Sequence, residues 1–481
     1  MIPLSSTISK LEELQQQHRA DFYYVGGVVR DVIRGVRPKD VDVVALGIKD
    51  DDLYRLLRES GEVQFVGRFG IYLFRSRGID DFIQISLPRR EVSTGPGHRD
   101  FDIEIINPKE GSAKEILLAD SRRRDFTINA MYLPVGFNRD LPEVIDFQRG
   151  LQDISRGVLR FVDDPYKRIS EDPIRIMRAF SLSARTGFYI HKSAKEAIAN
   201  LSELLEERPA ETVRIELEKI LLSEKPSKIL KLMLKLGTLS VVMPELADCA
   251  GISQAKKYHK YDVFTHCVCA CDNAPQDIVL RLAALLHDIG KPETRELKQG
   301  HYTFYNHEIA SVDAAYDILK RLRFSGYIIE EVLFLIRNHM YHYSRAWTDK
   351  AVRRFIKQVG ISESEMEDLS NFPLFILRKA DRLGSGFKTI AVTQRQKDFE
   401  DRIKDVYAKS TAFGIGDLVI GGRDLIESFK LEPSPIIGKV LRRLLDMVME
   451  YPSLNKKDKL LEASRDLLSS KEHIERDNIN G

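Results

Sequence analysis

Two aspartates one residue apart, behind a Gly-Gly turn, constrain the fold of this chain more than any other feature. Residues 22–25 (Phe-Tyr-Tyr-Val) predict an apolar strand, Gly26-Gly27 a tight turn, and residues 28–34 a short helix. A second strand follows, in which Asp40 and Asp42 alternate with valines. Because strand side chains point alternately to opposite faces, the two aspartates project together while the valines face a core.

Two carboxylates on one face favour a bound cation. Like charges side by side raise each other's pKa unless a cation lies between them. Mg²⁺ typically takes a pair of carboxylates together with substrate phosphates. Gly26 and Gly27 let backbone N–H groups and a helix N-terminus approach those phosphates. The pattern predicts a two-metal nucleotidyl-transfer site in which Asp40 and Asp42 are the catalytic residues and hold Mg²⁺.

Further motifs follow in order through the first half of the chain. They are Arg-Arg-Asp-Phe-Thr-Ile-Asn-Ala-Met at 123–131, Asp146 with Gly-Leu-Gln-Asp at 150–153, and Glu-Asp-Pro-Ile-Arg at 171–175. With the Gly-Gly-Val-Val-Arg-Asp turn at 26–31, this set resembles the head of bacterial tRNA nucleotidyltransferases (CCA-adding enzymes) and the related poly(A) polymerases. The resemblance implies a polymerase-β-like nucleotidyltransferase fold for the head.

The resemblance also implies which residues bind the nucleotide. Arg30, Arg123 and Arg124 are expected to contact the triphosphate, since guanidinium groups bind phosphate oxygens in a bidentate manner. One departure concerns Gln84, which stands where relatives often carry an acidic residue, so the identity of a third metal-side carboxylate stays open. The full expected nucleotide-binding set is Gly26, Gly27, Arg30, Arg123, Arg124, Asp125, Asn129, Asp172, Arg175 and Arg178.

Asp172 and Arg175 predict a base-selecting pair. Asp172-Pro173 is typical of a helix start, with Asp as N-cap and Pro at the first helical position. Arg175 then lies one turn on, so both side chains can meet one planar ligand. Cytosine and adenine offer an amino donor to a carboxylate and a ring acceptor to Arg, whereas uracil and guanine reverse that pattern. The alternative is a plain helix cap with a surface ion pair; the family's use of the Glu-Asp-x-x-Arg motif favours selection of C and A.

A second constellation of metal-ligand residues lies further along the chain. A His-Asp-Ile-Gly-Lys run at 287–291 ends a strongly apolar helical segment. Imidazole and carboxylate suit transition metals such as Ni, Co or Mn, and a bound ion can activate water against a phosphoester. The series resembles the HD phosphohydrolase superfamily, with His266, His287, Asp288 and Asp381 matching its four ligands. His307 and His339 resemble the extra ligands of two-metal members.

Composition limits the partners and the compartment. Lys+Arg 74 against Asp+Glu 72 leave a formal charge of +2, so RNA binding has to come from local basic clusters. These clusters are Arg122–Arg124, Lys256–Lys260, Arg353-Arg354, and Lys439 with Arg442-Arg443. We expect a cytoplasmic protein, because the chain shows neither a signal-like start nor an apolar run of membrane length. Cys249, Cys267, Cys269 and Cys271 are expected to be reduced thiols, mainly buried.

The expected architecture is an α+β head followed by an all-α remainder. We expect the head at 1–150, a helical neck and body for base selection and RNA binding at 151–255, an HD domain at 256–390, and a helical tail that contacts tRNA at 391–481. The predicted head strands are Tyr23–Val25, Val41–Ala45, Ile71–Phe74, Phe82–Leu87 and Tyr132–Val135. Residues 93–114, with Gly-Pro-Gly and Asn-Pro signals, are expected to form a loop over the active site.

The resemblance implies template-independent addition of C, C and A to tRNA 3′ ends from CTP and ATP. Alternatives within the class are an enzyme that adds only CC or only A, and a poly(A) polymerase. From other classes, the chain could be chiefly an HD-type phosphodiesterase or phosphatase, or a catalytically silent RNA-binding module. The intact Asp40/Asp42 pair disfavours the silent module. The sequence leaves the oligomeric state and the substrate of the HD site open.

Overall fold

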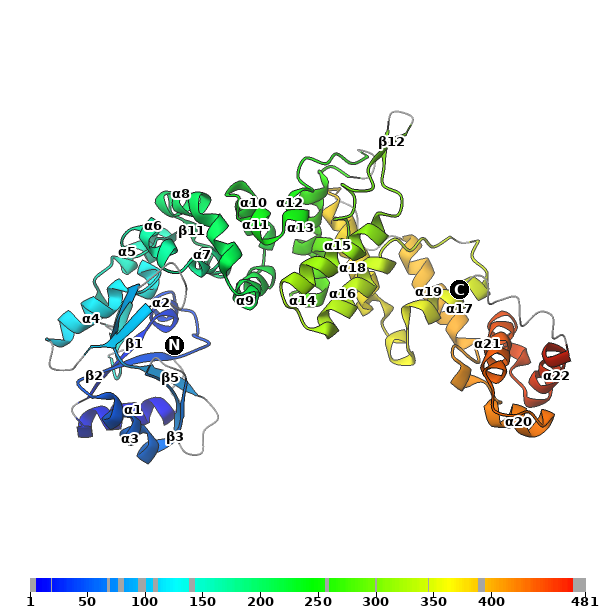
Figure 1. Ribbon diagram of the computed structural model, residues 1–481, viewed down its shortest axis with the longest axis horizontal. Helices are drawn as coiled ribbons and strands as arrows, with labels where there is room; N and C mark the ends of the chain where they lie inside the picture. Colours follow the sequence, from blue (N-terminus) through cyan, green and yellow to red (C-terminus); the bar gives the residue numbers. More distant parts are fainter. Residues whose placement is uncertain are drawn as a thin grey trace. The chain divides into compact units, whose positions relative to one another are not determined.

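The computed structural model of the chain has two compact units (Figure 1). The first comprises Met1–Ala250 and Tyr316–Ile329, and the second Gly251–Ala315 and Glu330–Gly481. The structure describes residues 6–18, 20–66, 70–76, 82–93, 101–106, 111–137, 143–255, 259–298, 301–344, 346–387 and 394–469. The finer division into head, body, HD domain and tail stays a prediction.

Residues 316–329 belong to the first unit, although the sequence places them inside the predicted HD domain. The contacts of this segment explain the difference. Both guanidinium nitrogens of Arg321 donate to the carboxylate of Glu245 at 2.8 Å. Arg214 lies over the ring of Phe324, with 5.6 Å between the guanidinium carbon and the ring centroid. The segment therefore packs on the helices that precede the HD region.

A seven-stranded mixed sheet forms the centre of the head. Its strand order is β3-β4-β5-β2-β1-β8-β9, and only β2 and β5 pair in parallel. All five predicted strands are present, with ends that differ by one or two residues, and β3 and β9 are additional. The strands are β1 Asp21–Val25, β2 Asp42–Leu46, β3 Gly61–Phe65, β4 Ile71–Ser76, β5 Ile83–Ser86, β8 Met131–Pro134 and β9 Ile145–Asp146.

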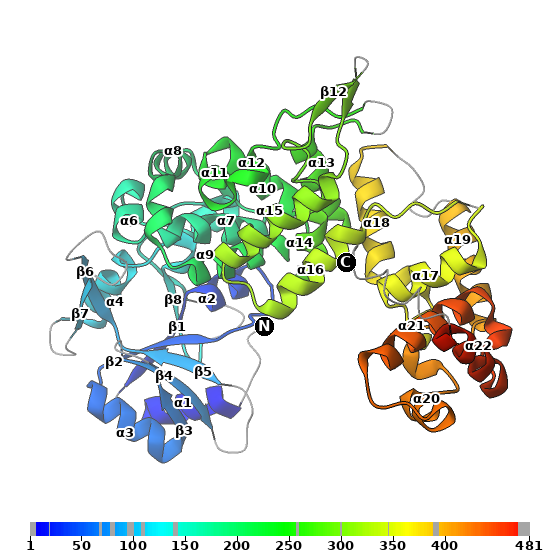
Figure 2. The same ribbon diagram turned by 45° about the vertical axis from the view of Figure 1, so that its right-hand side comes forward.

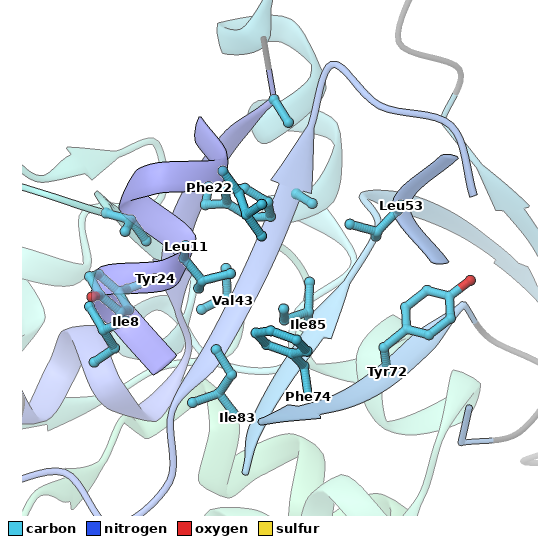
Figure 3. Close-up of a cluster of buried hydrophobic side chains, with 14 of the residues drawn as sticks. Ile8, Leu11, Phe22, Tyr24, Val43, Leu53, Tyr72, Phe74, Ile83 and Ile85 are labelled. Atoms are coloured by element: carbon cyan, nitrogen blue, oxygen red, sulfur yellow. The ribbon is translucent and has the colours of Figure 1, made fainter. Parts of the chain in front are cut away.

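Apolar side chains from alternate strand positions cover both faces of this sheet. On one face, helices α1 (Ser6–His18) and α3 (Asp50–Ser60) pack against residues such as Phe22, Val43 and Ile85 (Figure 3). On the other face, helix α4 (Ala113–Arg122) packs against Val44 and Tyr132. Because the core holds both faces, the register of β2 is fixed, and with it the direction of the Asp42 side chain.

The loop expected at 93–114 is wrong in part. Strand β7 (Phe101–Ile105) pairs with β6 (Arg89–Ser93) as a hairpin, and α4 starts at Ala113. Ser112 caps that helix, since its hydroxyl accepts from the Glu115 N–H while the Glu115 carboxylate accepts from the Ser112 N–H. Residues 94–100 and 107–110 lie outside the described part of the chain.

The rest of the first unit is almost entirely helical, as predicted from Leu151 onward. Prolines begin α6, α10 and α12, where their fixed φ suits the first turn. The elements are α2 Gly27–Ile33, η2 Thr127–Asn129, α5 Gly150–Arg156, β10 Val158–Leu159, α6 Pro165–Glu171, α7 Ile174–Thr186, β11 Tyr189–Ile190, α8 Lys192–Leu201, η3 Ser202–Glu207, α9 Ala210–Leu221, α10 Pro226–Lys235, α11 Thr238–Val242 and α12 Pro244–Ala247.

In its described residues, the second unit is helical apart from one short hairpin. Its elements are α13 Val263–Asn273, α14 Ile278–Leu286, β12 Glu296–Lys298, β13 His301–Thr303, α17 Asp349–Val359, η4 Glu363–Met366, η5 Leu369–Asn371, α18 Pro373–Gly384, α19 Gln394–Ala408, η6 Ile415–Asp417, α20 Gly422–Phe429, α21 Pro435–Glu450, η7 Pro452–Leu454 and α22 Lys457–Ser469. Helices α15 (His307–Arg321) and α16 (Gly326–Asn338) have residues in both units. The last helices share a separate apolar cluster around Leu425, Leu444 and Leu460.

Several side predictions can be checked on this fold. All four cysteines are free thiols, and Cys269 alone of them is not buried. In the part of the chain that the structure describes, no helix has both the length and the apolar character needed to cross a bilayer. The prediction that Arg353 is part of a basic cluster that binds RNA is wrong, because its buried guanidinium donates to the Met449 carbonyl and the Ser410 hydroxyl. Residues 256–258 of another predicted basic cluster lie outside the described residues.

Candidate active site and metal centre

The Gly-Gly turn brings bare backbone against the carboxylate of Asp42. Strand β1 ends at Val25, and Gly26 then takes φ 77° and ψ −134°, a conformation that only glycine adopts readily. A Cβ on Gly26 would lie 3.5 Å from Asp42 Oδ2 and 3.9 Å from an Arg124 guanidinium nitrogen. The space beside the carboxylate and the N-terminus of α2 is therefore open because residue 26 lacks a side chain.

Asp42 and Asp40 differ in their surroundings. Asp42 is the first residue of β2 and is half-buried, whereas Asp40 is exposed and precedes the strand. Burial raises the pKa of Asp42; Arg124 counteracts this, and the negative charge of Asp40 raises it further. Desolvated oxygen ligands beside a second carboxylate fit a hard divalent cation, which would remove the repulsion.

Gln84 lies next to Asp42 in the sheet. The two residues are direct partners in the parallel pairing of β2 with β5, so their side chains leave the same face. Gln84 is exposed. An acidic residue at this position would stand beside the Asp40/Asp42 pair; here a neutral amide occupies it.

A buried carboxylate that sequence reasoning missed holds the two predicted phosphate-binding arginines. Asp120, on α4, accepts from Arg123 at 2.8 Å and from Arg124 at 2.9 Å, and the Tyr132 hydroxyl donates to it at 2.6 Å. Burial would raise the pKa of Asp120, but the two guanidinium groups hold it well below its usual range. Asp120 thus fixes both arginines, and Arg124 lies beside the Gly26 turn.

The remaining head residues of the predicted set gather around η2 and α7. Arg30 is buried, and its guanidinium donates to Asp31 at 2.9 Å and to Asn129 Oδ1 at 2.8 Å. Asp125 pairs with Arg178 at 2.6 Å. Burial raises the pKa of Asp125, but Arg178 and Arg175 together bring it below its ordinary value.

An open pocket of about 360 Å³ adjoins this group. Asp125, Asn129 and Arg178 line one part of it, and α9 supplies Thr212 and Lys219. The pocket brings three of the predicted nucleotide-binding residues to one concave surface with charges of both signs. Such a surface suits a polar, anionic small molecule.

The side chains of Asp172 and Arg175, which are predicted to meet one planar ligand, lie at the start of α7 and are each bound to a different local group. Arg175 is buried and donates to Glu171 at 3.0 Å and to the Arg168 carbonyl at 2.8 Å. Asp172 Oδ1 accepts from the Ile174 N–H at 3.3 Å at the start of α7, which begins one residue later than predicted. Each side chain is thus held by its own local partner.

The second predicted constellation comes together in the second unit. His266 lies on α13, His287 and Asp288 follow α14, His307 begins α15, His339 follows α16, and Asp381 lies on α18. The Nε2 atom of His266 is 3.1 Å from Asp381 Oδ1 and 3.3 Å from Asp288 Oδ2. His307 Nε2 is 3.1 Å, and His339 Nε2 3.8 Å, from Asp288 Oδ1. All six predicted ligands therefore meet around Asp288.

Two glycines allow the close helix packing that builds this cluster. A Cβ on Gly290 would lie 2.4 Å from the Ser311 nitrogen and 2.6 Å from the His307 carbonyl oxygen. A Cβ on Gly384 would lie 2.7 Å from the Ala270 nitrogen. Gly290 therefore lets the His-Asp turn approach α15, and Gly384 lets α18 approach α13. These contacts place His307 and Asp381 against their partners.

Three of the histidines present Nε2 to the centre of the cluster. Nδ1 of His287, His307 and His339 lies 2.7–2.9 Å from the backbone carbonyl three residues earlier. This bond fixes the ring and leaves Nε2 as the ligand atom. Among the described residues, the buried Nε2 atoms of His307 and His339 have no hydrogen-bond partner. Buried imidazole nitrogens aimed at carboxylates fit a transition-metal ion.

The charges in the cluster are strongly coupled. Burial lowers the pKa of His287, but Asp288 and Asp381 raise it to about 10. Burial and the neighbouring His287 lower the pKa of His339 to about 3. Burial raises the pKa of Asp288, but His287 and Lys291 hold it well below its usual range. Burial likewise raises the pKa of Asp381, but hydrogen bonds from His266 and His287 hold it well below its usual range, so both carboxylates are charged.

Family models and solved structures both match this chain. The chain matches three family models: "Poly A polymerase head domain" at residues 22–160, "Probable RNA and SrmB- binding site of polymerase A" at 187–249, and "HD domain" at 258–385. Among solved structures, the CCA-adding enzyme of Bacillus stearothermophilus in complex with CTP shares the fold, with a TM-score of 0.67 and 19% identity over 98% of this chain and 100% of that chain.

Three curated relatives with different named activities resemble this chain. The multifunctional CCA protein of Pasteurella multocida is 33% identical over 60% of this chain and 67% of its own length. The CC-adding tRNA nucleotidyltransferase of Thermus thermophilus is 28% identical over 89% of this chain and 90% of its own length. The A-adding tRNA nucleotidyltransferase of Deinococcus radiodurans is 28% identical over 88% of this chain and 90% of its own length. The chain belongs to the tRNA nucleotidyltransferase and poly(A) polymerase family, and its members carry out divalent-metal-dependent nucleotidyl transfer.

Proposed function

We propose that this protein adds C, C and A to the 3′ end of tRNA, using CTP and ATP without a template. The observation that carries the proposal is the arrangement around Asp42: a glycine backbone turn, the Arg124 guanidinium held in place by Asp120, and a second carboxylate two residues away. Backbone N–H groups and guanidinium groups bind triphosphate oxygens, and the carboxylates bind the cations that accompany them. Because the proposed substrates are tRNA, CTP and ATP, we propose a cytoplasmic location for the protein.

Asp40 and Asp42 would hold Mg²⁺, which lowers the pKa of the attacking 3′-hydroxyl and stabilises the charge on the departing pyrophosphate. Arg123 and Arg124 would orient the triphosphate. Both guanidinium groups are already held by Asp120, so little conformational entropy is lost when phosphate binds. Gln84, the direct partner of Asp42 on β5, offers a neutral amide where relatives often carry an acidic residue.

Asp172 and Arg175 would select the base. Their present partners, the Ile174 N–H and Glu171, hold the two side chains at the start of α7. A carboxylate acceptor and a guanidinium donor complement the edges of cytosine and adenine but not those of uracil or guanine.

Labelled CTP and ATP, offered separately and together, would test the function on three RNA substrates. These are tRNA lacking CCA, tRNA ending in CC, and oligo(A). We expect two additions from CTP on the first, one from ATP on the second, and no extension of oligo(A). Addition of only CC or only A would identify one of the specialised activities, and extension of oligo(A) a poly(A) polymerase.

The six-ligand cluster around Asp288 supports a second function. We propose that it binds a transition metal such as Ni, Co or Mn and hydrolyses phosphoesters, with 2′,3′-cyclic phosphates as the first substrates to test. The supporting observation is that the buried Nε2 atoms of His307 and His339 face Asp288, at 3.1 Å and 3.8 Å from its Oδ1 atom, without forming a hydrogen bond. Lys291, 2.6 Å from Asp288 Oδ2, supplies a cation beside the site.

The double variant His287→Ala with Asp288→Ala tests this second function. We expect it to lose metal-dependent hydrolysis of 2′,3′-cyclic phosphates while it retains nucleotide addition, since the head residues lie in the other unit. Circular dichroism would check that the variant is folded. Loss of nucleotide addition in a folded double variant would contradict the independence of the two sites.

A further inference from the structure

The hairpin next to the metal cluster exposes an unusual amount of apolar surface. Strands β12 and β13 form a two-stranded sheet that extends away from the helices of its unit (Figure 2). Leu297 is 65% exposed and its cross-strand partner Tyr302 is 41% exposed. A lone two-stranded hairpin is at best marginally stable in water. A ribbon that carries its large side chains in solvent is better suited to binding than to core packing.

Cationic side chains lie on the exposed tyrosine rings. The Arg295 guanidinium carbon is 3.6 Å from the centre of the Tyr302 ring. Lys298 Nζ is 5.0 Å from the centre of the Tyr305 ring, which is 66% exposed. These cation–π contacts orient the two rings while leaving much of their surface in solvent. Lys298 also pairs with Glu296 at 2.6 Å, so an incoming phosphate would replace one anionic partner with another.

Tyr305 is tied to the metal cluster by its neighbours in the chain. The Phe304 carbonyl lies 2.8 Å from Nδ1 of His307. Lys291 Nζ lies 5.7 Å from the Phe304 ring and also contacts Asp288. Asn306, with φ 60°, turns the chain from Tyr305 into α15. Because Tyr305 and His307 are two residues apart, their Cα atoms are at most about 7.6 Å apart.

We propose that Tyr305 and Tyr302, together with Lys298 and Arg295, form a stacking platform for the 3′-terminal bases of single-stranded RNA. The terminal phosphate of that RNA would lie at the metal cluster, so the inference rests on the proposed hydrolase function. Aromatic rings interleaved with cations are the surface that single-stranded RNA requires, because bases stack on the rings and cations neutralise phosphates. Two exposed rings, Tyr302 on β13 and Tyr305 in the turn that follows it, favour an oligonucleotide over a mononucleotide.

A fluorescent RNA tests the platform without relying on hydrolysis. A short oligoribonucleotide with 2-aminopurine as its last base and a 3′-phosphate cannot be extended by the head, and stacking quenches its fluorescence. We expect quenching by the full-length protein, and roughly five- to hundredfold weaker binding by Tyr305→Ala, in line with the cost of losing one base–aromatic stack. Tyr305→Phe should bind like the wild type. Tyr327→Ala is the matched control, because Tyr327 is 70% exposed and belongs to the first unit.

Hydrolysis provides the second readout. The ratio of kcat/KM for a dinucleotide 2′,3′-cyclic phosphate to that for bis(p-nitrophenyl) phosphate should fall in Tyr305→Ala, mainly through KM. Equal quenching and an equal ratio in wild type, Tyr305→Ala and Tyr302→Ala would overturn the platform. If the wild type hydrolyses neither substrate with any of the three metals, the hydrolase proposal fails instead, and the quenching result still decides whether RNA stacks on the hairpin.

Discussion

Gly26→Ala should remove nucleotide addition with only a modest loss of stability. At φ 77° and ψ −134° an alanine is strained by about 1–3 kcal/mol. Its methyl group would lie 3.5 Å from Asp42 Oδ2, an ordinary contact that adds little further strain. The same methyl would occupy space beside the carboxylate. That space would be needed by a cation about 2.0–2.1 Å from the carboxylate and by the phosphates bound to the cation. Since a misplacement of about 1 Å at a reacting centre costs about 10²-fold in rate, we expect at least that loss in kcat/KM.

Gly35→Ala is the matched control for this prediction. Gly35 also has a positive φ, 69°, but a Cβ there would meet nothing within 4 Å. Urea denaturation should therefore show losses of stability of about 1–3 kcal/mol in both variants. Single-turnover incorporation of CTP into tRNA lacking CCA should fall only in Gly26→Ala. Equal incorporation by the two variants, after correction for the folded fraction, would refute the reasoning that the Gly26 turn leaves room for the metal and phosphates.

Three further predictions concern base choice, the metal cluster, and the ion pairs of Asp120 with Arg123 and Arg124. Asp172→Ala and Arg175→Ala should lower CTP and ATP use and raise the relative use of UTP or GTP by about ten- to a hundredfold, because a hydrogen bond to a charged group contributes about 1.5–3 kcal/mol. Single-nucleotide incorporation rates with all four triphosphates measure this preference. An unchanged preference in both variants would leave Asp172 as a helix cap. Gly290→Ala should weaken Mn²⁺ binding, measured by calorimetry, and should lower stability by about 1–3 kcal/mol, measured by thermal unfolding, because its Cβ overpacks against the α15 backbone. Gly326→Ala is the control, because a Cβ there meets nothing within 4 Å and should not destabilise the protein. Asp120→Asn should lower the free energy of unfolding by about 3–5 kcal/mol at pH 7. Because the pKa of Asp120 is lowered on folding, its contribution to stability is present above about pH 4 and is lost as the pH falls further. The free energies of unfolding measured by urea titration at pH 7 and pH 3 should therefore differ less in the variant than in the wild type.

The sequence predicted the elements that local pattern determines. The alternation around Asp42, the Gly-Gly turn and the apolar runs of the head strands gave β1, β2, β4, β5 and β8 nearly at their observed positions. The ligand cluster of the second unit was also predicted, but from a family resemblance and not from spacing. The site-residue roles themselves stay predictions.

The features that were missed depend on tertiary contacts or on competing signals. Asp120 reads as an ordinary polar position of a helix, and only packing of α4 on the sheet buries it beside Arg123 and Arg124. The spacing of Asp172 and Arg175 predicts that both side chains can meet one ligand, but it does not show that Glu171, one turn before Arg175, binds the Arg175 guanidinium. Strand β7 alternates Phe-Asp-Ile-Glu-Ile, but Gly and Pro signals on both sides led to a loop prediction.

Nucleotide incorporation by Asp42→Ala tests the central claim most directly. The measurement is single-turnover addition of labelled CTP to tRNA lacking CCA, with tRNA binding followed in parallel by fluorescence anisotropy. Because only a metal-holding carboxylate is removed, we predict that incorporation falls below a few per cent of wild type while tRNA binding is largely kept; Asp40→Ala should behave alike. Incorporation above a few per cent in a folded, tRNA-binding Asp42→Ala variant would contradict the account and place the catalytic metals elsewhere.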